Sequence, residues 1–368
     1  MKVWSFHKAI YLVAVITLIV FCAGSVGAQA APDDSSKSVA SPDAQPTARG
    51  NISSSDLTPK IVEDWTTPSL KGSELKMSGT IVGDPSDHDS IFTREITRVE
   101  WRPGDPVDLY ILKPDGVKNP PVILYLYSYP FENDRFLNPE FGKFLTKNGF
   151  AAVGFASALT GQRYHTPRPM KEWFVSQLQE SLATSAHDVQ MVLNYLASRG
   201  DMDMDRVGMF GDGSGASIAI LAAAVDSRIK TLDLLDPWGD WPEWVAKSTL
   251  IPEKERPDYL KPEWLAGVAP LDPVKWLPEL KTQKVRIQFV KTVTVTPAEA
   301  KQKVEAAAPA NAKIVHYDVA AAFRTTIAGG AGFDWIKQQM QFSVVPPLSA
   351  TGKAQESGSS TQTKDSQR

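Results

Sequence analysis

The chain has 368 residues, of which 42% are hydrophobic, so it holds enough apolar material for one large core or two smaller ones. Its net charge of −3 at pH 7 gives no sign of a nucleic-acid partner, for which a strongly basic surface is expected. The only cysteine is Cys22, so the chain beyond it contains no disulfide, thiolate metal ligand or cysteine nucleophile.

Residues 1–30 have the features of a secretory signal peptide. Lysines precede an apolar run over residues 9–24, and Ala28-Gln29-Ala30 supplies a small-x-small cleavage site. The run is shorter than the roughly 20 residues that a membrane-spanning helix needs, and the bulky Phe21 before Cys22 argues against lipidation. We expect a secreted or periplasmic protein with no stable membrane anchor after cleavage; an uncleaved anchor is the alternative. Cleavage would change the net charge to −5, because the segment holds two lysines and no acidic residue.

Two segments flank the folded body. Residues 31–60 are rich in Ser, Asp, Pro and Ala, and residues 346–368 are dominated by Ser, Thr, Gln and Lys. Such compositions bury too little apolar surface to offset the entropy lost on ordering. We therefore expect a disordered spacer and a disordered tail on either side of a folded domain over residues 61–345.

Within the folded body, β-branched and aromatic runs alternate with segments of helical periodicity, which predicts an α/β fold with a mostly parallel central sheet flanked by helices. The run at 121–127 is almost continuously apolar, as expected of a strand buried on both faces. Strands are predicted at 92–101, 106–113, 121–127, 150–156, 206–210, 231–235, 285–290 and 313–319, and helices at 139–148, 181–199, 218–225, 297–308 and 333–341.

Residues 236–280 interrupt this alternation. The segment is rich in proline and contains five tryptophans, at positions 238, 241, 244, 264 and 276. We expect it to form a short helical cap over the carboxyl edge of the sheet. The indoles either fill the core of the cap or contact a ligand, and Trp238 is our candidate for ligand contact.

Residues 206–217, RVGMFGDGSGAS, predict a strand, a sharp turn and a helix. They resemble the turn on which α/β hydrolases carry a catalytic serine in the pattern G-x-S-x-G. When the pattern is laid over Gly211 to Gly215, its middle position falls on Gly213, which has no side chain to attack a carbonyl. A nucleophilic Ser214 would need the turn to shift by one residue and would place Asp212 where the turn disfavours a side chain. We expect Ser214 instead to cap free backbone N–H groups of the helix.

The resemblance extends over residues 92–341 and is to the dienelactone-hydrolase and prolyl-oligopeptidase branches of the α/β-hydrolase superfamily. It rests on the helix and strand before Gly211, on the Ala-Pro-Leu-Asp-Pro run at 269–273, and on the Tyr-Asp-Val-Ala-Ala-Ala-Phe run at 317–323. It implies the α/β-hydrolase fold and a serine, histidine and acid that act together, because a neutral serine hydroxyl is a poor nucleophile.

The other two members of that catalytic group are missing as well. The loop that would carry the acid, residues 291–297, contains no carboxylate. The place of the histidine falls on Ala321 or Ala322, and no histidine follows His316. Losses at three separate loops are hard to attribute to a misplaced register, so we infer a hydrolase scaffold that has lost its catalytic group.

Other titratable residues give weaker signals. His165, between Arg163 and Arg168, lies in a polar loop that would open toward the site, although a surface histidine is the simpler interpretation. Asp233 and Asp236 end the strand before the cap, where some α/β hydrolases carry their acid. The acidic loop around His88 does not have the spacing of an EF-hand. We therefore expect no metal and no cofactor.

The main hypothesis is a protein without serine-hydrolase activity that binds a small-molecule or peptide ligand, or a partner, at the turn and the cap. The candidate binding residues are Gly213, Ser214, Gly215, Tyr127, Ser128, Tyr129, Trp238 and His165. One alternative is an active serine hydrolase that cleaves a carboxylic ester or peptide bond with Ser214. Another is a scaffold that contacts other proteins through the tryptophan-rich cap.

Overall fold

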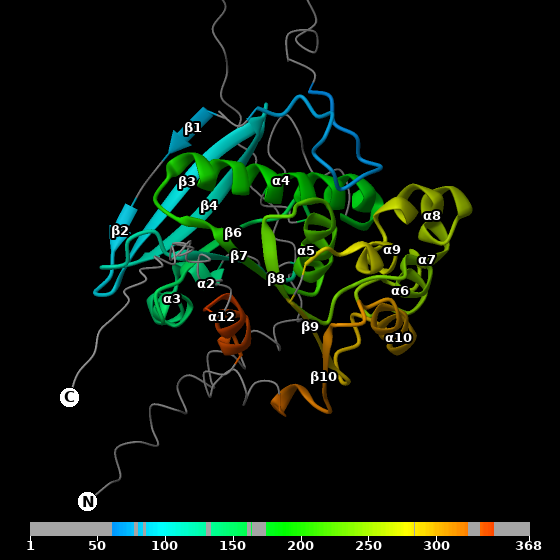
Figure 1. The fold of residues 1–368 in the computed structure, drawn as a ribbon. Helices are drawn as coiled ribbons and strands as arrows, with labels where there is room; N and C mark the ends of the chain where they lie inside the picture. Colours follow the sequence, from blue (N-terminus) through cyan, green and yellow to red (C-terminus); the bar gives the residue numbers. More distant parts are fainter. Residues whose placement is uncertain are drawn as a thin grey trace, which may run out of the picture.

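The computed structural model describes residues 61–76, 80–83, 86–129, 134–159, 163, 174–282, 284–322 and 332–341 (Figure 1). The expected signal peptide, spacer and tail lie outside these ranges, as do His165 and Arg168. Within them, no helix is both long and apolar enough to cross a membrane.

A mixed ten-stranded sheet forms the centre of the described chain, in the order β1-β3-β4-β6-β5-β7-β8-β9-β10, with β2 paired to β3. From β6 through β5, β7, β8 and β9 to β10 adjacent strands run parallel, whereas β1, β2 and β4 pair antiparallel with β3 and β4 pairs antiparallel with β6. This confirms the predicted mostly parallel sheet. The strands are β1 (Thr80–Gly83), β2 (Ser86–His88), β3 (Phe92–Arg102), β4 (Asp105–Pro114), β5 (Pro121–Leu126), β6 (Ala151–Phe155), β7 (Asp203–Asp212), β8 (Ile229–Leu235), β9 (Lys284–Val290) and β10 (Lys313–Tyr317).

Helices cover both faces of this sheet (Figure 1). The helix α5 packs closely on one face of β7. This contact requires a glycine at position 211, since a Cβ there would lie 2.4 Å from Ala216 Cα. The helix α12 packs on the opposite face, where a Cβ at Gly208 would meet Met340. The helices are α2 (Asp134–Leu137), α3 (Pro139–Thr146), α4 (Leu178–Arg199), α5 (Ser214–Val225), α6 (Trp241–Lys247), α7 (Arg256–Tyr259), α8 (Pro262–Val268), α9 (Pro273–Trp276), α10 (Ala298–Ala306) and α12 (Asp334–Gln341), with short 3₁₀ turns at 174–177, 269–271 and 277–279.

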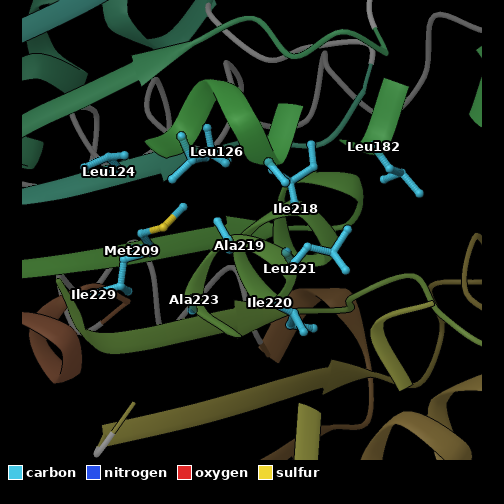
Figure 2. Packing of buried hydrophobic residues seen from close by; sticks show 14 of the residues in the cluster. Leu124, Leu126, Leu182, Met209, Ile218, Ala219, Ile220, Leu221, Ala223 and Ile229 are labelled. Carbon is cyan, nitrogen blue, oxygen red and sulfur yellow. The ribbon is translucent and has the colours of Figure 1, made fainter. Parts of the chain in front are cut away.

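The small residues at the start of α5 allow its backbone to approach the sheet closely. A Cβ on Gly215 would lie 2.1 Å from the carbonyl oxygen of Leu126 in β5, so any larger residue would push the helix away. Figure 2 shows Ile218, Ala219 and Leu221 of this helix among the buried side chains that fill the core. This tight packing fixes the position of the turn between β7 and α5.

The cap forms as predicted, from helices α6 to α9 after the carboxyl end of β8 (Figure 1). Trp238, Trp241 and Trp244 are buried, with Trp244 stacked on Trp238 at a ring-centroid distance of 4.9 Å and edge-on to Trp241 at 5.7 Å. These three indoles form the core of the cap and are not available for surface contacts with another protein.

A buried ion network joins residues 61–76 to the body of the fold. Arg102 of β3 donates to Glu63 from Nε at 2.6 Å and from Nη2 at 2.7 Å, and from Nη1 to Asp188 of α4 at 2.6 Å. Arg163 donates to Asp188 at 2.5 Å and to Asp105 at 2.6 Å. Arg163, expected beside a site histidine, is therefore committed to this network.

His187 of α4 extends the network to the backbone. Its Nδ1 lies 2.6 Å from Glu63 Oε1, and its Nε2 lies 3.1 Å from the carbonyl oxygen of Thr67. Burial alone would raise the pKa of Glu63, but hydrogen bonds from Arg102 and His187 outweigh it and lower the pKa to about 2. The ionised Glu63 thus fastens the N-terminal segment to α4.

Replacing Arg102 with Met should lower the free energy of unfolding by about 3–5 kcal/mol, because Glu63 and Asp188 would then be buried without the cation that bridges them. Urea denaturation measures this loss. The matched control is Arg98→Met at the exposed Arg98–Asp108 pair, where we expect a loss below about 1 kcal/mol. Equal losses in the two variants would contradict a stabilising role for the buried network.

Candidate functional site

The turn between β7 and α5 has the sharp geometry that the sequence predicts. Gly213 stands between the last residue of the strand and the first of the helix, with φ +55° and ψ −115°. Glycine adopts this region of backbone conformation far more readily than other residues. The Gly213 N–H donates to the carbonyl oxygen of Leu235 at 2.9 Å, which ties the turn to the neighbouring strand β8.

The space that a side chain at position 213 would occupy is filled. A Cβ built there would lie 2.4 Å from Ser128 Oγ, 2.9 Å from Ser128 Cβ and 3.2 Å from Trp238 Nε1. These separations are shorter than the roughly 3.5–4.0 Å at which carbon atoms pack favourably. The hydroxyl of Ser128 and the indole of Trp238 therefore occupy the place of a nucleophilic side chain.

The pairing of β5 with β7 explains why Ser128 reaches this position. Leu126 pairs with Gly211 in the parallel ladder, so two residues further along the chains Ser128 is level with Gly213. Ser128 is partly exposed, and its hydroxyl makes no hydrogen bond within the described part of the chain. It was one of the predicted binding residues, but its contact with the nucleophile position was not foreseen.

Ser214 is buried and already hydrogen-bonded. Its side chain has no solvent exposure, and its Oγ accepts a hydrogen bond from the backbone N–H of Tyr129 at 2.9 Å. The expectation that Ser214 caps the helix is wrong, because α5 has no side-chain cap and the hydroxyl contacts the loop after β5 instead. In active α/β hydrolases that loop supplies an N–H group to the oxyanion, whereas here Ser214 takes up the N–H of Tyr129.

The described histidines are each engaged elsewhere. His88 lies 2.8 Å from Asp115, His187 belongs to the buried ion network, and His316 of β10 lies 3.3 Å from Glu305. Ala321 and Ala322 carry no group that could accept a proton. Within the described chain, no imidazole is placed to act as a base at the turn.

The two carboxylates at the end of β8 are neutralised by buried cations. Asp233 accepts two hydrogen bonds from Arg286, at 2.8 and 2.6 Å, and one from Gln288 at 2.9 Å. Asp236 accepts from the Val290 N–H at 3.1 Å and lies 3.0 Å from Lys301 Nζ. Burial raises the pKa of both carboxyls, while Arg286 and Lys301 oppose that rise. Neither is free to orient a catalytic histidine.

Asp212, immediately before Gly213, differs from these carboxylates. It is partly exposed, and no hydrogen bond or ion pair reaches its carboxylate from the described residues. Burial raises its pKa from 3.8 to about 6; the charge of Arg135 opposes the rise and that of Asp236 adds to it. A carboxyl group without a partner beside the turn is a feature that the sequence did not single out.

No metal site emerges from the described residues, where no group of three or more His, Cys, Asp or Glu side chains is suitably placed. In the acidic loop, Asp87 pairs with Arg94, and Asp89 accepts from the Ser90 N–H at 2.6 Å. Asp84 lies outside the described ranges.

Comparison with solved structures shows the fold. Acetyl xylan esterase 1 from Thermoanaerobacterium sp. JW/SL YS485 superposes with a TM-score of 0.55 at 14% identity, over 66% of this chain and 82% of that one. An acetyl xylan esterase from Paenibacillus sp. R4 gives 0.53 at 16% identity over 70% and 89%, and an S-formylglutathione hydrolase from Agrobacterium tumefaciens gives 0.52 at 12% over 71% and 99%. The chain therefore has the α/β-hydrolase fold.

No family model and no curated protein matches the sequence. At 12–16% identity, structural similarity establishes the fold and leaves the chemistry of the site to be argued from its residues. The narrower assignment to the dienelactone-hydrolase or prolyl-oligopeptidase branch stays a prediction.

Replacing Gly213 with Ser should lower the free energy of unfolding by about 2–4 kcal/mol, because a side chain at positive φ is strained and its Cβ overlaps Ser128. In a Ser128→Gly background the same replacement should cost about 1 kcal/mol less, since the overlap is gone. Chemical denaturation of both single variants and the double variant measures this coupling. Strictly additive losses would show that Ser128 does not occupy the position.

Replacing Asp212 with Asn should stabilise the protein at pH 7 by about 1–3 kcal/mol. Because burial raises the pKa to about 6, the folded state binds a proton more tightly than the unfolded chain, whose carboxyl titrates near 3.8. The ionised carboxylate therefore costs stability above pH 6, and this cost vanishes as the pH falls below 3.8. Thermal unfolding of both proteins across this range tests the prediction, and a variant less stable than the parent at pH 7 would refute it.

Proposed function

We propose that this protein is an α/β-hydrolase-fold protein without serine-hydrolase activity that binds a ligand or partner at the turn and the adjoining cap. The observation that carries the proposal is the occupied nucleophile position at Gly213, where Ser128 and Trp238 fill the space of the missing side chain. The filled position leaves no room for a side chain at residue 213 without a shift of its neighbours.

The alternative, an active hydrolase using Ser214, receives less support. A serine nucleophile must be reachable by the substrate and hydrogen-bonded to a base. Ser214 has no exposed surface, and its oxygen already accepts the Tyr129 N–H. The described chain places no histidine beside it, so the hydroxyl would remain protonated and a weak nucleophile.

The binding part of the proposal rests on groups that the fold leaves uncommitted at the carboxyl edge of the sheet. Ser128 and Asp212 are partly exposed and make no hydrogen bonds with the described chain. Ligands of open α/β sheets bind outside the carboxyl ends of the parallel strands, at the point where the strand order reverses. Two of the structural neighbours are named acetyl xylan esterases, and we place the ligand of this protein at the corresponding edge.

The N-terminal features add a proposal about location. The basic start, the apolar run over residues 9–24 and the cleavage pattern at 28–30 support export from the cytoplasm and removal of residues 1–30. N-terminal sequencing of the protein recovered from its native compartment tests this, and a chain that still begins at Met1 would contradict it.

Incubation with a fluorophosphonate probe should leave the purified protein unlabelled, because covalent attack requires an activated serine. The Gly213→Ser variant should also remain unlabelled, since it restores the hydroxyl without a base. An active serine hydrolase serves as the positive control. Labelling that maps to Ser214 by peptide analysis and disappears in Ser214→Ala would replace this proposal with the alternative.

A further inference from the structure

We propose that the outer edge of β10 pairs antiparallel with β10 of a second copy of this chain, so that two sheets join across a two-fold axis at Val315. The strand comprises residues 313–317, Lys-Ile-Val-His-Tyr. The strands β8 and β9 separate it from β7 and the turn, so this surface is distinct from the proposed ligand site. The inference therefore goes beyond the proposed function.

The strand β10 is the last in the strand order. It pairs with β9 on one side, and the described chain places no strand on its other side (Figure 1). The Lys291 N–H donates to the carbonyl oxygen of Tyr317 at 2.9 Å, so the backbone groups of Tyr317 point toward β9. These directions alternate along a strand, which turns Val315 toward β9 and the N–H and C=O groups of Ile314 and His316 outward. The described chain supplies no partner for these outward groups.

The edge lacks most of the devices that keep sheets from joining. Natural edge strands are interrupted by proline, by bulges or by inward-pointing charges. The strand β10 contains no proline, and its register with β9 is continuous over all five residues. At the other end of the strand order, β1 has an irregular register between Ile81 and Gly83. A regular, uninterrupted edge favours the addition of another strand.

Val315, at the centre of β10, is an apolar residue that the fold leaves outside its cores. It is partly exposed and belongs to neither of the two core clusters, whereas Ile314 packs against one of them and Tyr317 against the other. Contact with the same valine of a second copy would remove apolar surface from water on both chains. This favours a two-fold axis at Val315.

The same register satisfies the outward backbone groups. With the two Val315 residues opposite each other, Ile314 lies opposite His316 of the second copy. In an antiparallel ladder such a pair exchanges two N–H to C=O hydrogen bonds, and the pair at Val315 is the non-hydrogen-bonded one beside it. The two-fold axis repeats the Ile314–His316 pair on the other side of Val315. The edge is therefore self-complementary.

The charges at the two ends of β10 also favour a second copy as the occupant. The strand begins with Lys313, and the carboxylate of Asp318 follows its last residue. Antiparallel pairing brings the beginning of each copy beside the end of the other. Lys313 then lies opposite Tyr317 and next to Asp318 of the second copy, and no like charges are opposite each other.

Cysteine cross-linking tests the register. In a Cys22→Ser background the introduced thiol is the only one. Val315→Cys should form a disulfide-linked dimer on oxidation with copper phenanthroline, because Cα atoms of a non-hydrogen-bonded pair are about 4.5 Å apart, within the range of a disulfide. Ile314→Cys is the matched control. Its counterpart is displaced by two residues, roughly 6.6 Å along the strand, so it should not cross-link. Non-reducing electrophoresis measures both.

Analytical ultracentrifugation tests the association itself. The full chain should sediment with twice the mass of one copy. Val315→Glu and Val315→Lys each place like charges at the two-fold axis and should each raise the Kd of the dimer about tenfold or more. An equal mixture of the two variants should dimerise again, because Glu then faces Lys. Val117→Glu, at an exposed valine outside β10, should leave the Kd unchanged. Circular dichroism establishes that each variant is folded.

Three results would overturn the proposal. The first is a full chain that sediments as a monomer at millimolar concentration. The second is a dimer in which Ile314→Cys cross-links and Val315→Cys does not. The third is a dimer whose Kd is unchanged in both Val315→Glu and Val315→Lys. None of these results bears on the loss of serine-hydrolase activity, which fluorophosphonate labelling decides separately.

Discussion

The close approach of α5 to the ends of β5 and β7 is the constraint on which the rest of the site depends. The helix backbone can approach this closely because Gly211 and Gly215 have no side chains at the points of contact. The chain then turns from β7 into α5 through Gly213, which has a positive φ. This conformation fixes the direction in which a side chain at position 213 would point. The same geometry brings the loop after β5 over the turn, so that Ser128 and Trp238 close the space above it.

The chain has the α/β-hydrolase fold, and polar groups around the turn contribute to its stability. Ser214 binds the backbone of the facing loop, and Asp233 is locked into a buried pair with Arg286. Such contacts keep buried polar atoms satisfied, but they also remove those atoms from chemistry. The packing of the core and the approach of α5 at the turn do not depend on a catalytic serine, histidine and acid.

The sequence predicted the sheet, the cap and the turn well, since these follow from local patterns: apolar runs, helical periodicity and the spacing of glycines at 211, 213 and 215. The role of Ser214 was predicted wrongly because its partner, Tyr129, is 85 residues away and only the fold brings the two together. The occupation of position 213 by Ser128 was missed for the same reason. Only the register between β5 and β7 places Ser128 beside Gly213, and this register cannot be inferred from the sequence before the pairing of the two strands is known.

The pairing of charged residues that are far apart in the chain could not be predicted from the sequence either. The buried network connects Glu63, Arg102 and Asp188 across separate parts of the chain, and the sequence gives each of them only as an isolated charged residue. That Asp212 has no hydrogen-bond partner among the described residues could not be predicted either, because a missing partner is recognised only when the surroundings are known. These are the residues for which the three-dimensional arrangement adds most to the functional argument.

A high-resolution crystal structure of the protein tests the central claim most directly. The account predicts Ser128 Oγ lying over Gly213 and Ser214 Oγ buried against the Tyr129 N–H. A structure with Ser214 Oγ open to solvent and within about 2.6–3.2 Å of an imidazole nitrogen would contradict it.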